Sequence, residues 1–295
     1  MHISEIRDWR DYELVDSGGF SKLERFGEYI VWRPEPQAIW KPALDSSEWE
    51  RLHHARFARE KPETGSERGN WILKKGSPEQ WFIQYSSGEL KFRLRVGLTS
   101  SGHVGVFPEQ SNNWNYIFHH LRQFKVSKPQ VLNLFAYTGG ATLAALAGGA
   151  TVVHVDSVRS VLTWSRNNME ASGLEGVRWL AEDALRFTHR EVRRGSKYHA
   201  IILDPPAYGR GAGGEKWILE DSLGELLDLC QHLLVDQPSM IVLNLYSMGF
   251  SSLVAANLVQ PIAGNNTTVE YGELTVSDRG GRQLPLGVVA RFIRM

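Results

Sequence analysis

The feature that most constrains the fold is an alternation of short apolar runs with longer amphipathic segments, from about residue 125 onward. Such alternation is typical of βαβ units, whose strands form a parallel sheet covered by helices. We expect strands at 130–135, 151–155, 177–181, 199–203 and 240–245, and helices at 141–147, 158–172, 184–193 and about 216–234. An antiparallel hairpin is expected from 269–276 and 286–293 around a turn at 277–281. The pattern predicts an α/β fold with a doubly wound, mainly parallel seven-stranded sheet.

The part of the chain before this alternation has short apolar or aromatic runs broken by Gly, Pro, Ser and Asn. We expect antiparallel strands at 29–32, 71–73, 81–85 and 90–96, and a short helix ending near residue 124. A chain of 295 residues is long enough for two domains. We therefore predict a smaller N-terminal β-rich substrate-recognition module at 1–106 and a cofactor-binding domain at 107–295. The aromatic residues of the module either stack on bases or fill its core, and core filling is favoured.

Composition excludes several classes of protein. The chain has 33 basic and 33 acidic residues, so no overall positive field indicates a nucleic-acid partner. Two basic stretches, 51–61 and 91–95, are interpreted as solvated faces when taken alone. The single cysteine, Cys230, excludes an intramolecular disulfide and a cysteine-based zinc site, and no metal is expected. Without a secretion signal or an apolar run of roughly 18 residues, a cytoplasmic protein with no membrane partner is expected.

Candidate ligand-binding groups follow successive strands of the predicted sheet, where ligands bind in doubly wound folds. The loop after the first strand contains Phe135, Ala136, Tyr137, Thr138, Gly139 and Gly140. Its paired glycines allow close approach of the backbone to a ligand, although a tight turn that binds nothing is an equal alternative. Asp156, followed by Ser157, ends the second strand. Its carboxylate either accepts hydrogen bonds from a ribose diol, or Asp156 or Ser157 caps the next helix.

The third and fourth strands also end in acidic loops. Asp183, followed by Ala184, could hold an adenine amino group and cap the next helix at the same time. The fourth strand runs into Asp204, Pro205, Pro206, Ala207 and Tyr208, which is the most specific signal in the chain. Two prolines fix a rigid exit from the strand, and we expect their carbonyls to face the cleft. A purely structural turn is the alternative.

Together, the runs VLNLFAYTGG, HVDS, AEDA and IILDPPAYGRG resemble the class I S-adenosylmethionine (AdoMet)-dependent methyltransferases. The resemblance covers about residues 105–295 and is specifically to the family related to the large-subunit (23S) ribosomal RNA methyltransferases. It implies a class I methyltransferase sheet with AdoMet as cofactor. It further implies that the 135–140 loop wraps the methionine part, Asp156 binds the ribose, Asp183 lies at the adenine, and Asp204 to Tyr208 border the transfer site. Asp204 is expected to be both a catalytic and a cofactor-binding residue.

Two further segments carry the resemblance outside these loops. Phe107, Glu109, Asn113 and Trp114 resemble the segment that in this family folds over the cofactor. The patterns KLERFG at 22–27 and RPEPQA at 33–38 are similar to those of a bacterial subfamily whose substrates the sequence does not assign.

The methyl acceptor is inferred from the absence of a suitable cysteine and from the Asp-Pro-Pro-x-Tyr loop. Cytosine-5 methylation needs a cysteine thiolate, which the related enzymes place after the fifth strand. Here Ser247 stands in that place, and Cys230 lies in an amphipathic helix where we expect it to be packed. An Asp-Pro-Pro-x-Tyr loop suits a nitrogen acceptor, with Asp204 orienting the N–H and Tyr208 stacking on a ring. We predict N-methylation of a base in structured RNA, with ribosomal RNA favoured.

Three alternatives remain at this point. The methyltransferase could act on a protein or a small molecule, or the chain could be a non-catalytic RNA-binding or assembly protein that retains the fold. A nicotinamide-dependent oxidoreductase is disfavoured, because the 135–140 loop lacks the G-x-G-x-x-G order that accommodates a pyrophosphate. The sequence does not predict the oligomeric state, the modified atom, or whether the N-terminal module binds RNA.

Overall fold

The computed structural model describes residues 2–5, 9–60, 68–210, 214, 216–246 and 249–295. Ser247 therefore lies outside the described residues. Two compact units are present. The α/β unit consists of Met1–Ser4, Gln110–Leu274 and Gly287–Met295, and the β unit consists of Glu5–Glu109 and Thr275–Leu286. The division into functional domains at 1–106 and 107–295 stays a prediction.

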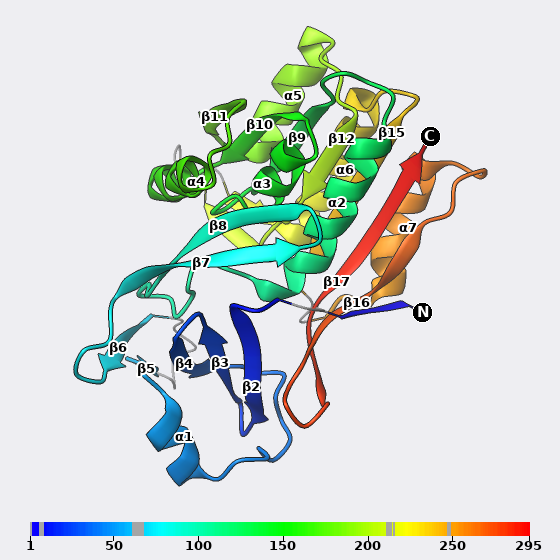
Figure 1. Cartoon of the computed structure of the whole chain (residues 1–295). Coiled ribbons are helices and arrows are strands. Elements are labelled where there is room, and N and C mark those ends of the chain that lie inside the picture. The colour runs from blue at the N-terminus through cyan, green and yellow to red at the C-terminus, as the bar shows by residue number, and fades with distance from the viewer. Residues whose placement is uncertain (1, 6–8, 61–67, 211–213, 215, 247–248) are drawn as a thin grey trace. The chain divides into compact units, whose positions relative to one another are not determined.

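The large sheet of the chain has the strand order β1-β16-β17-β15-β12-β9-β10-β11 (Figure 1). Its strands are β1 (His2–Glu5), β9 (Gln130–Leu134), β10 (Thr151–Asp156), β11 (Val177–Ala181), β12 (Ala200–Leu203), β15 (Ser239–Leu245), β16 (Glu270–Ser277) and β17 (Gln283–Arg294). β9 to β12 and β15 pair in parallel, and β17 runs antiparallel to β15. The predicted doubly wound sheet of seven strands is confirmed, and β1 adds an eighth strand at its edge.

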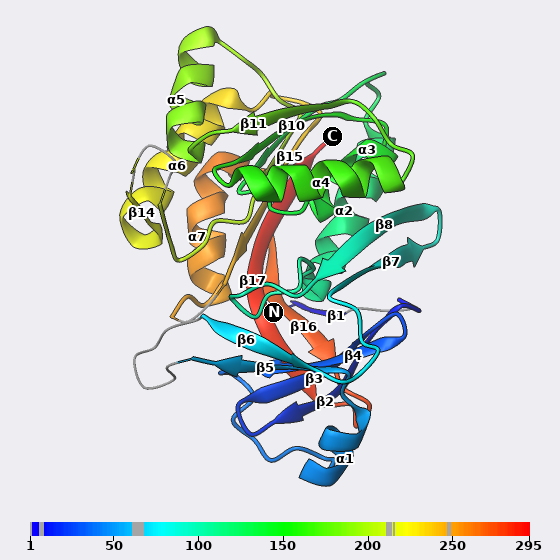
Figure 2. The same ribbon diagram turned by 90° about the vertical axis from the view of Figure 1, so that its left-hand side faces the viewer.

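Helices cover both faces of this sheet, so its central strands are mostly apolar and lie buried. All four residues of β12 and all seven of β15 are buried. The helices are α2 (Ser111–Gln123), α3 (Gly140–Ala147), α4 (Arg159–Ala171), α5 (Ala184–Arg194), α6 (Leu219–Leu233) and α7 (Ser252–Ala263). α5, α6 and α7 pack on one face and contribute to its main apolar core, while α2, α3 and α4 lie on the other (Figure 2).

One predicted boundary in this unit is wrong. The expected helix at about 216–234 begins only at Leu219, because Lys216–Ile218 forms strand β14, which pairs antiparallel with β13 (Tyr208–Arg210). Trp217 is held in this strand by its indole, whose Nε1 donates to the carbonyl of Pro206 at 2.7 Å. The structure also adds α7, which the sequence pattern did not predict.

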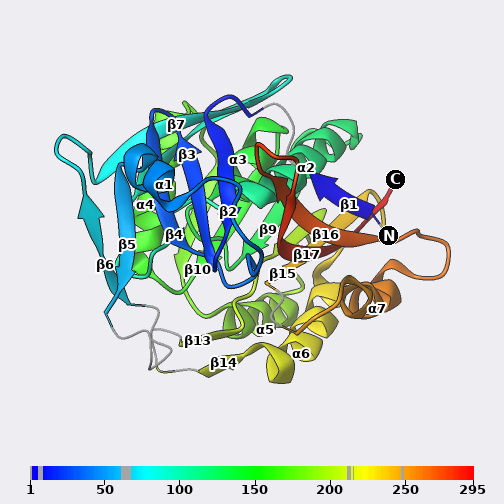
Figure 3. The same cartoon turned by 90° about the horizontal axis from the view of Figure 1, so that it is seen from below.

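The β unit has a five-stranded sheet in the order β2-β3-β4-β5-β6 and a separate two-stranded ribbon (Figure 3). Its elements are β2 (Tyr12–Gly18), β3 (Ser21–Phe26), β4 (Tyr29–Pro34), α1 (Ser46–Leu52), β5 (Ala55–Arg59), β6 (Gly69–Leu73), β7 (Gln80–Ser87) and β8 (Leu90–Gly97). The four predicted strands are confirmed, but the expectation of antiparallel pairing fails at one place. β4 and β5 are parallel, because the connection through α1 returns the chain to the same end of the sheet.

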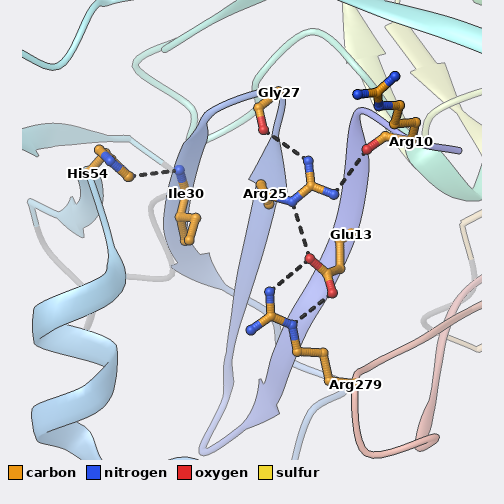
Figure 4. A network of polar contacts seen from close by, with 7 residues as sticks. All are labelled: Arg10, Glu13, Arg25, Gly27, Ile30, His54 and Arg279. Carbon is orange, nitrogen blue, oxygen red and sulfur yellow. Dashed lines mark hydrogen bonds and ion pairs between the residues drawn. The ribbon is translucent and has the colours of Figure 1, made fainter.

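The turn between β16 and β17 belongs to the β unit through contacts with β2. Glu13 accepts hydrogen bonds from Nε and Nη2 of Arg279 at 2.7 and 2.9 Å, and from Nε of Arg25 at 3.2 Å (Figure 4). Asp278 adds a hydrogen bond from the hydroxyl of Ser17 at 3.2 Å. The contacts of Arg279 and Asp278 join residues more than 250 positions apart in the chain.

Candidate active site

The loop after β9 has an unusual backbone. Phe135, Tyr137 and Gly139 have φ angles of 54°, 49° and 91°, in the left-handed region that side chains other than glycine rarely adopt. A Cβ on Gly139 would lie 2.1 Å from Oγ of Ser165 on α4, so only glycine fits there. The loop is therefore a strained and closely packed turn, as is common at functional sites.

The same loop packs against α2, which carries two other predicted site residues. A Cβ on Gly140 would lie 2.5 Å from Cζ2 of Trp114, whose ring is buried. Ala136 is buried, and the carbonyl of Thr138 accepts a hydrogen bond from Nδ2 of Asn168 at 2.9 Å. The structure thus brings Trp114 to the glycine loop, as the predicted set requires.

Asp156 ties the loops after β9 and β10 together. Its Oδ2 accepts from the N–H of Tyr137 at 3.0 Å, and its Oδ1 accepts from the N–H of Val158 at 2.9 Å. Burial raises the pKa of Asp156, and the two backbone hydrogen bonds oppose that rise. The N-cap residue of α4 is Val158, so neither Asp156 nor Ser157 caps this helix as the alternative proposed. Each carboxylate oxygen keeps acceptor capacity for a further donor.

Asp183 caps the next helix in the way expected. Its side chain accepts from the N–H of Arg186 at 2.9 Å, and Ala184 is the buried first residue of α5. The adjacent Glu182 forms an ion pair with Arg190. Asp183 therefore has a confirmed structural role, and its contact with adenine stays a prediction.

Asp204 lies directly after β12 and is held by two side-chain amides. Oδ1 accepts from Nδ2 of Asn244 at 2.7 Å, and Oδ2 lies 3.5 Å from Nε2 of Gln110. Burial raises the pKa of Asp204 to about 7, while the hydrogen bond from Asn244 acts in the opposite direction. A carboxyl group with a pKa near neutrality can accept a proton and release it again at physiological pH.

The amides that hold Asp204 are themselves fixed. Oε1 of Gln110 accepts from Nδ2 of Asn113 at 2.9 Å, and Oδ1 of Asn113 accepts from Nη1 of Arg291 on β17 at 3.1 Å. Sequence reasoning predicted Asn113 but missed Asn244 and Arg291, because no local pattern shows that β15 and β17 reach this edge of the sheet.

The proline loop is joined to the glycine loop by an aromatic pair. The ring of Trp217 lies 4.8 Å from that of Phe135, and its indole donates to the carbonyl of Pro206. The expectation that both proline carbonyls face a cleft therefore needs correction, since that of Pro206 accepts from Trp217. Pro205 is buried, whereas Tyr208 is 51% exposed at the end of the loop.

Phe107 and Glu109 belong to the β unit. Glu109 is buried, and burial raises its pKa to about 7 against the opposing charge of Lys22. The ring of Phe107 lies 5.4 Å from that of His103. Their predicted place at the cofactor stays a prediction.

Three buried polar side chains that sequence reasoning missed, those of Asn133, Thr142 and His154, form a hydrogen-bonded row beside the glycine loop. The hydroxyl of Thr142 accepts from Nδ2 of Asn133 at 2.9 Å and lies 2.9 Å from Nδ1 of His154. Burial lowers the pKa of His154 to about 3, so its imidazole is neutral. The Thr142 hydroxyl on α3 thus contacts both Asn133 on β9 and His154 on β10, which is a structural role.

In the described part of the chain, no group of three or more His, Cys, Asp or Glu side chains is placed to hold a metal ion. Within the same ranges, no helix is long and apolar enough to cross a membrane.

The strand order, the glycine loop after the central strand, the acids after β10 and β11 and the Asp-Pro-Pro loop after β12 define the class I methyltransferase fold. Comparison with known proteins agrees with this class. The family of S-adenosylmethionine-dependent methyltransferases matches residues 37–254. The crystal structure of a SAM-dependent methyltransferase from Agrobacterium tumefaciens is 35% identical, with a TM-score of 0.89 over 99% of this chain and 93% of that one. The chain belongs to the S-adenosylmethionine-dependent methyltransferase family, which confirms the predicted family, enzyme class and cofactor.

Curated relatives match shorter stretches. The ribosomal RNA large subunit methyltransferase I of Aeromonas salmonicida is 30% identical over 119 residues, which cover 39% of this chain and 29% of that protein. The ribosomal RNA large subunit methyltransferase K/L of Syntrophotalea carbinolica is 35% identical over 129 residues, which cover 41% of this chain and 18% of that protein. The chain thus matches less than a third of the length of either relative.

The residues of the site fit AdoMet. Asp156 offers a partly buried carboxylate with remaining acceptor capacity, which suits a ribose diol. It stands beside a loop whose left-handed residues bend the backbone sharply, next to the buried ring of Trp114.

Proposed function

We propose that this protein N-methylates a base in structured RNA, with ribosomal RNA as the favoured acceptor. The observation that carries the proposal is the environment of Asp204. Its carboxyl group follows β12, has a pKa of about 7 and is oriented by Asn244 and Gln110. The exposed ring of Tyr208 lies four residues further along the chain, at the start of β13.

In the proposed reaction, AdoMet supplies a methyl group on a positively charged sulfur. The Asp204 carboxylate accepts the N–H of the base and directs the nitrogen lone pair toward that methyl group. As the new N–C bond forms, the sulfur keeps the electron pair of the broken S–C bond, and Asp204 takes the proton. Alignment of the acceptor and exclusion of water account for most of the catalysis in a displacement of this kind.

The cofactor side of the proposal rests on the loops after β9, β10 and β11. We assign the 135–140 loop to the methionine part of AdoMet, Asp156 to the ribose and Asp183 to the adenine. Asp156 supports this assignment, because its contacts are to backbone N–H groups that fix the carboxylate without neutralising it. Phe107, Glu109, Asn113 and Trp114 are assigned to the segment that covers the cofactor.

A nitrogen acceptor is favoured over carbon 5 of cytosine, because the only cysteine is unsuitable as a nucleophile. Cys230 is fully buried in α6, and burial raises the pKa of its thiol far above the physiological range. The sequence contains no other thiol that could add to a pyrimidine ring.

An RNA acceptor is supported by the two curated relatives, both named as ribosomal RNA large subunit methyltransferases. An exposed tyrosine at the transfer loop also suits a base taken out of its stack. Such an acceptor would place the enzyme in the cytoplasm.

The test supplies the enzyme with labelled AdoMet and, in separate reactions, with unmodified large-subunit ribosomal RNA or total protein extract as the acceptor. The Asp204→Asn variant is the control. We expect the label in RNA and, after digestion to nucleosides, in a product whose added methyl group is on a ring or exocyclic nitrogen. A carbon-methylated or ribose-methylated nucleoside would contradict the nitrogen assignment. Label in protein alone would contradict the RNA acceptor.

A further inference from the structure

The ribbon formed by β7 and β8 in the β unit has two chemically different faces. Its buried face consists of Ile83, Tyr85, Leu90, Phe92, Leu94 and Val96. The opposite face presents Gln80, Phe82, Gln84, Lys91, Arg93 and Arg95, of which Arg95 is partly buried and the others are exposed. We call this second set the β7–β8 cationic face. The basic residues of the stretch 91–95, interpreted from the sequence as a solvated face, thus lie on one side of a regular strand pair.

The charge of this face has one sign. β7 and β8 together contain three cationic residues and no acidic residue, in a chain whose formal net charge is zero. Surfaces that serve solubility alone usually mix both signs. The three cations alternate along β8, so their Cα atoms repeat at about 6.6 Å along the strand. This repeat is comparable to the spacing of successive phosphates along an extended nucleic-acid strand.

An aromatic ring stands among the cations. Phe82 is 41% exposed, and the guanidinium of Arg93 lies 5.0 Å from the centroid of its ring. Phe82 also faces Arg95 across the strand pair, and Nη1 of Arg95 donates to Oε1 of Gln80 at 3.1 Å. Cations combined with an exposed aromatic ring form the typical platform for single-stranded nucleic acid, because every base has a π-face that can stack.

The backbone edge of β7 does not offer an alternative mode of binding along Gln84. The N–H of Gln84 donates to Oδ2 of Asp11 at 2.8 Å, and its carbonyl accepts from Nε1 of Trp9 at 2.8 Å. At Gln84, therefore, no further strand can pair with the edge of β7.

We propose that the β7–β8 cationic face binds a single-stranded segment of the RNA acceptor, with phosphates at Lys91, Arg93 and Arg95 and a base on Phe82. The proposal rests on the proposed RNA acceptor and gives the β unit a role in binding RNA. Charge complementarity selects a polyanionic strand, and the aromatic ring selects a nucleic acid over an anionic membrane surface.

The experiment measures binding of a short fluorescent single-stranded RNA by anisotropy over a range of salt concentrations. The test variant is Lys91→Ala with Arg93→Ala and Arg95→Ala. The matched control is Lys125→Ala with Lys128→Ala and Arg193→Ala, which removes the same charge from exposed positions of the α/β unit. We expect the test variant to lose at least roughly tenfold in affinity, and its salt slope to fall by about 2, as three lost phosphate contacts require. The control should lose much less.

The aromatic contribution is tested separately. Phe82→Ala should weaken RNA binding by roughly fivefold, as loss of one stacked base predicts, and Phe82→Trp should retain it. Thermal unfolding and AdoMet titration of every variant should match the wild type, because these side chains lie outside the cofactor loops.

The outcomes separate the two proposals. If the wild type binds RNA and the test variant binds equally well with the same salt slope, the surface proposal is wrong and the RNA acceptor stands. If the wild type does not bind RNA, both proposals fail. The assignment to RNA would be overturned by two results together. The test variant would lose affinity equally for RNA and for vesicles of anionic lipid, and Phe82→Ala would bind RNA like the wild type; the surface would then bind anions in general.

Discussion

Asp156 at the end of β10 and Asp204 directly after β12 lie on either side of β9 in the same sheet, yet their carboxyl groups are held by different kinds of donor. Asp156 is fixed by the backbone N–H groups of Tyr137, in the loop after β9, and of Val158, the N-cap residue of α4. Asp204 is fixed by the side-chain amides of Asn244 and Gln110, which come from β15 and from the residue before α2. Two carboxyl groups with the same chemistry are thus given different surroundings.

The difference is consistent with the proposed roles of Asp156 in cofactor binding and Asp204 in acceptor binding. Backbone donors hold a carboxylate at a fixed place, which suits an invariable ligand such as a cofactor ribose. Side-chain amides in a buried place leave the pKa of Asp204 at about 7, which suits a group that accepts a proton from a substrate. The following predictions test this contrast, from the largest expected effect to the smallest.

The largest effect is expected from Asp204→Asn. An amide at this position cannot take the proton of the acceptor nitrogen, so kcat for methyl transfer should fall by roughly 10²–10³-fold. The affinity for AdoMet should not change. Steady-state methyl transfer together with cofactor titration measures both, and a variant that retains wild-type kcat would remove Asp204 from the reaction.

The same variant should alter stability in a pH-dependent way. The folded-state pKa of Asp204, about 7, exceeds the ordinary value of 3.8, so folding favours the neutral carboxyl. The stabilisation is complete below about pH 4 and is lost as pH rises to about 7, because the unfolded chain ionises first. Above pH 7 the wild type should therefore be less stable than Asp204→Asn by up to about 4 kcal/mol, and less to the extent that water reaches the carboxyl.

Urea unfolding of both proteins at about pH 5 and pH 8 measures this change. The advantage of the variant should grow between the two pH values. An equal difference at both would mean that the carboxyl group of Asp204 is ionised at an ordinary pKa.

A smaller effect is expected from Asn244→Ala. The hydrogen bond from Asn244 lowers the pKa of Asp204 against the effect of burial, so its loss should raise that pKa further. The midpoint of the pH–rate profile should move upward by about one pH unit, and the rate should recover toward the wild type at high pH. A uniform loss of rate at all pH values would instead indicate a purely structural role.

The smallest effect concerns the glycine loop. Gly140→Ala forces a Cβ against the ring of Trp114 and should lower the free energy of unfolding by about 1–3 kcal/mol. A Cβ on Gly224 in α6 would have no neighbouring atom within 4 Å, so Gly224→Ala should stabilise the protein by about 0.5–1 kcal/mol. Thermal unfolding of the two variants gives the comparison. Equal effects would mean that the loop yields to the added methyl group.

The parallel strands could be predicted because their signal is local. β12 is a continuous apolar run that leads into the Asp-Pro-Pro segment, and β15 is apolar except for Ser239 and Asn244. The start of α6 could not be predicted in the same way. Trp217 and Ile218 are compatible with a helix, and only the pairing of β14 with Tyr208–Arg210 makes them a strand.

The residues of the candidate site also differ in whether a local sequence signal marks them. Asp156, Asp183 and Asp204 follow their strands in sequence, so their place at the sheet edge could be predicted. Asn244 and Arg291 reach Asp204 and its neighbours through the order of β15 and β17 in the sheet. The helix α1 was missed although its signal is local, since Asp45 and Glu48 form a capping box.

The measurement that tests the proposed roles of Asp156 and Asp204 most directly is isothermal titration of AdoMet into the wild type, Asp156→Ala and Asp204→Asn, with NAD and NADH as competing ligands. We predict that AdoMet binds the wild type, that Asp156→Ala weakens its affinity by roughly 10–100-fold through loss of hydrogen bonds to a charged group, and that Asp204→Asn binds like the wild type. Equal weakening in both variants, or weakening only in Asp204→Asn, would contradict the assignment of the two carboxyl groups to cofactor and acceptor.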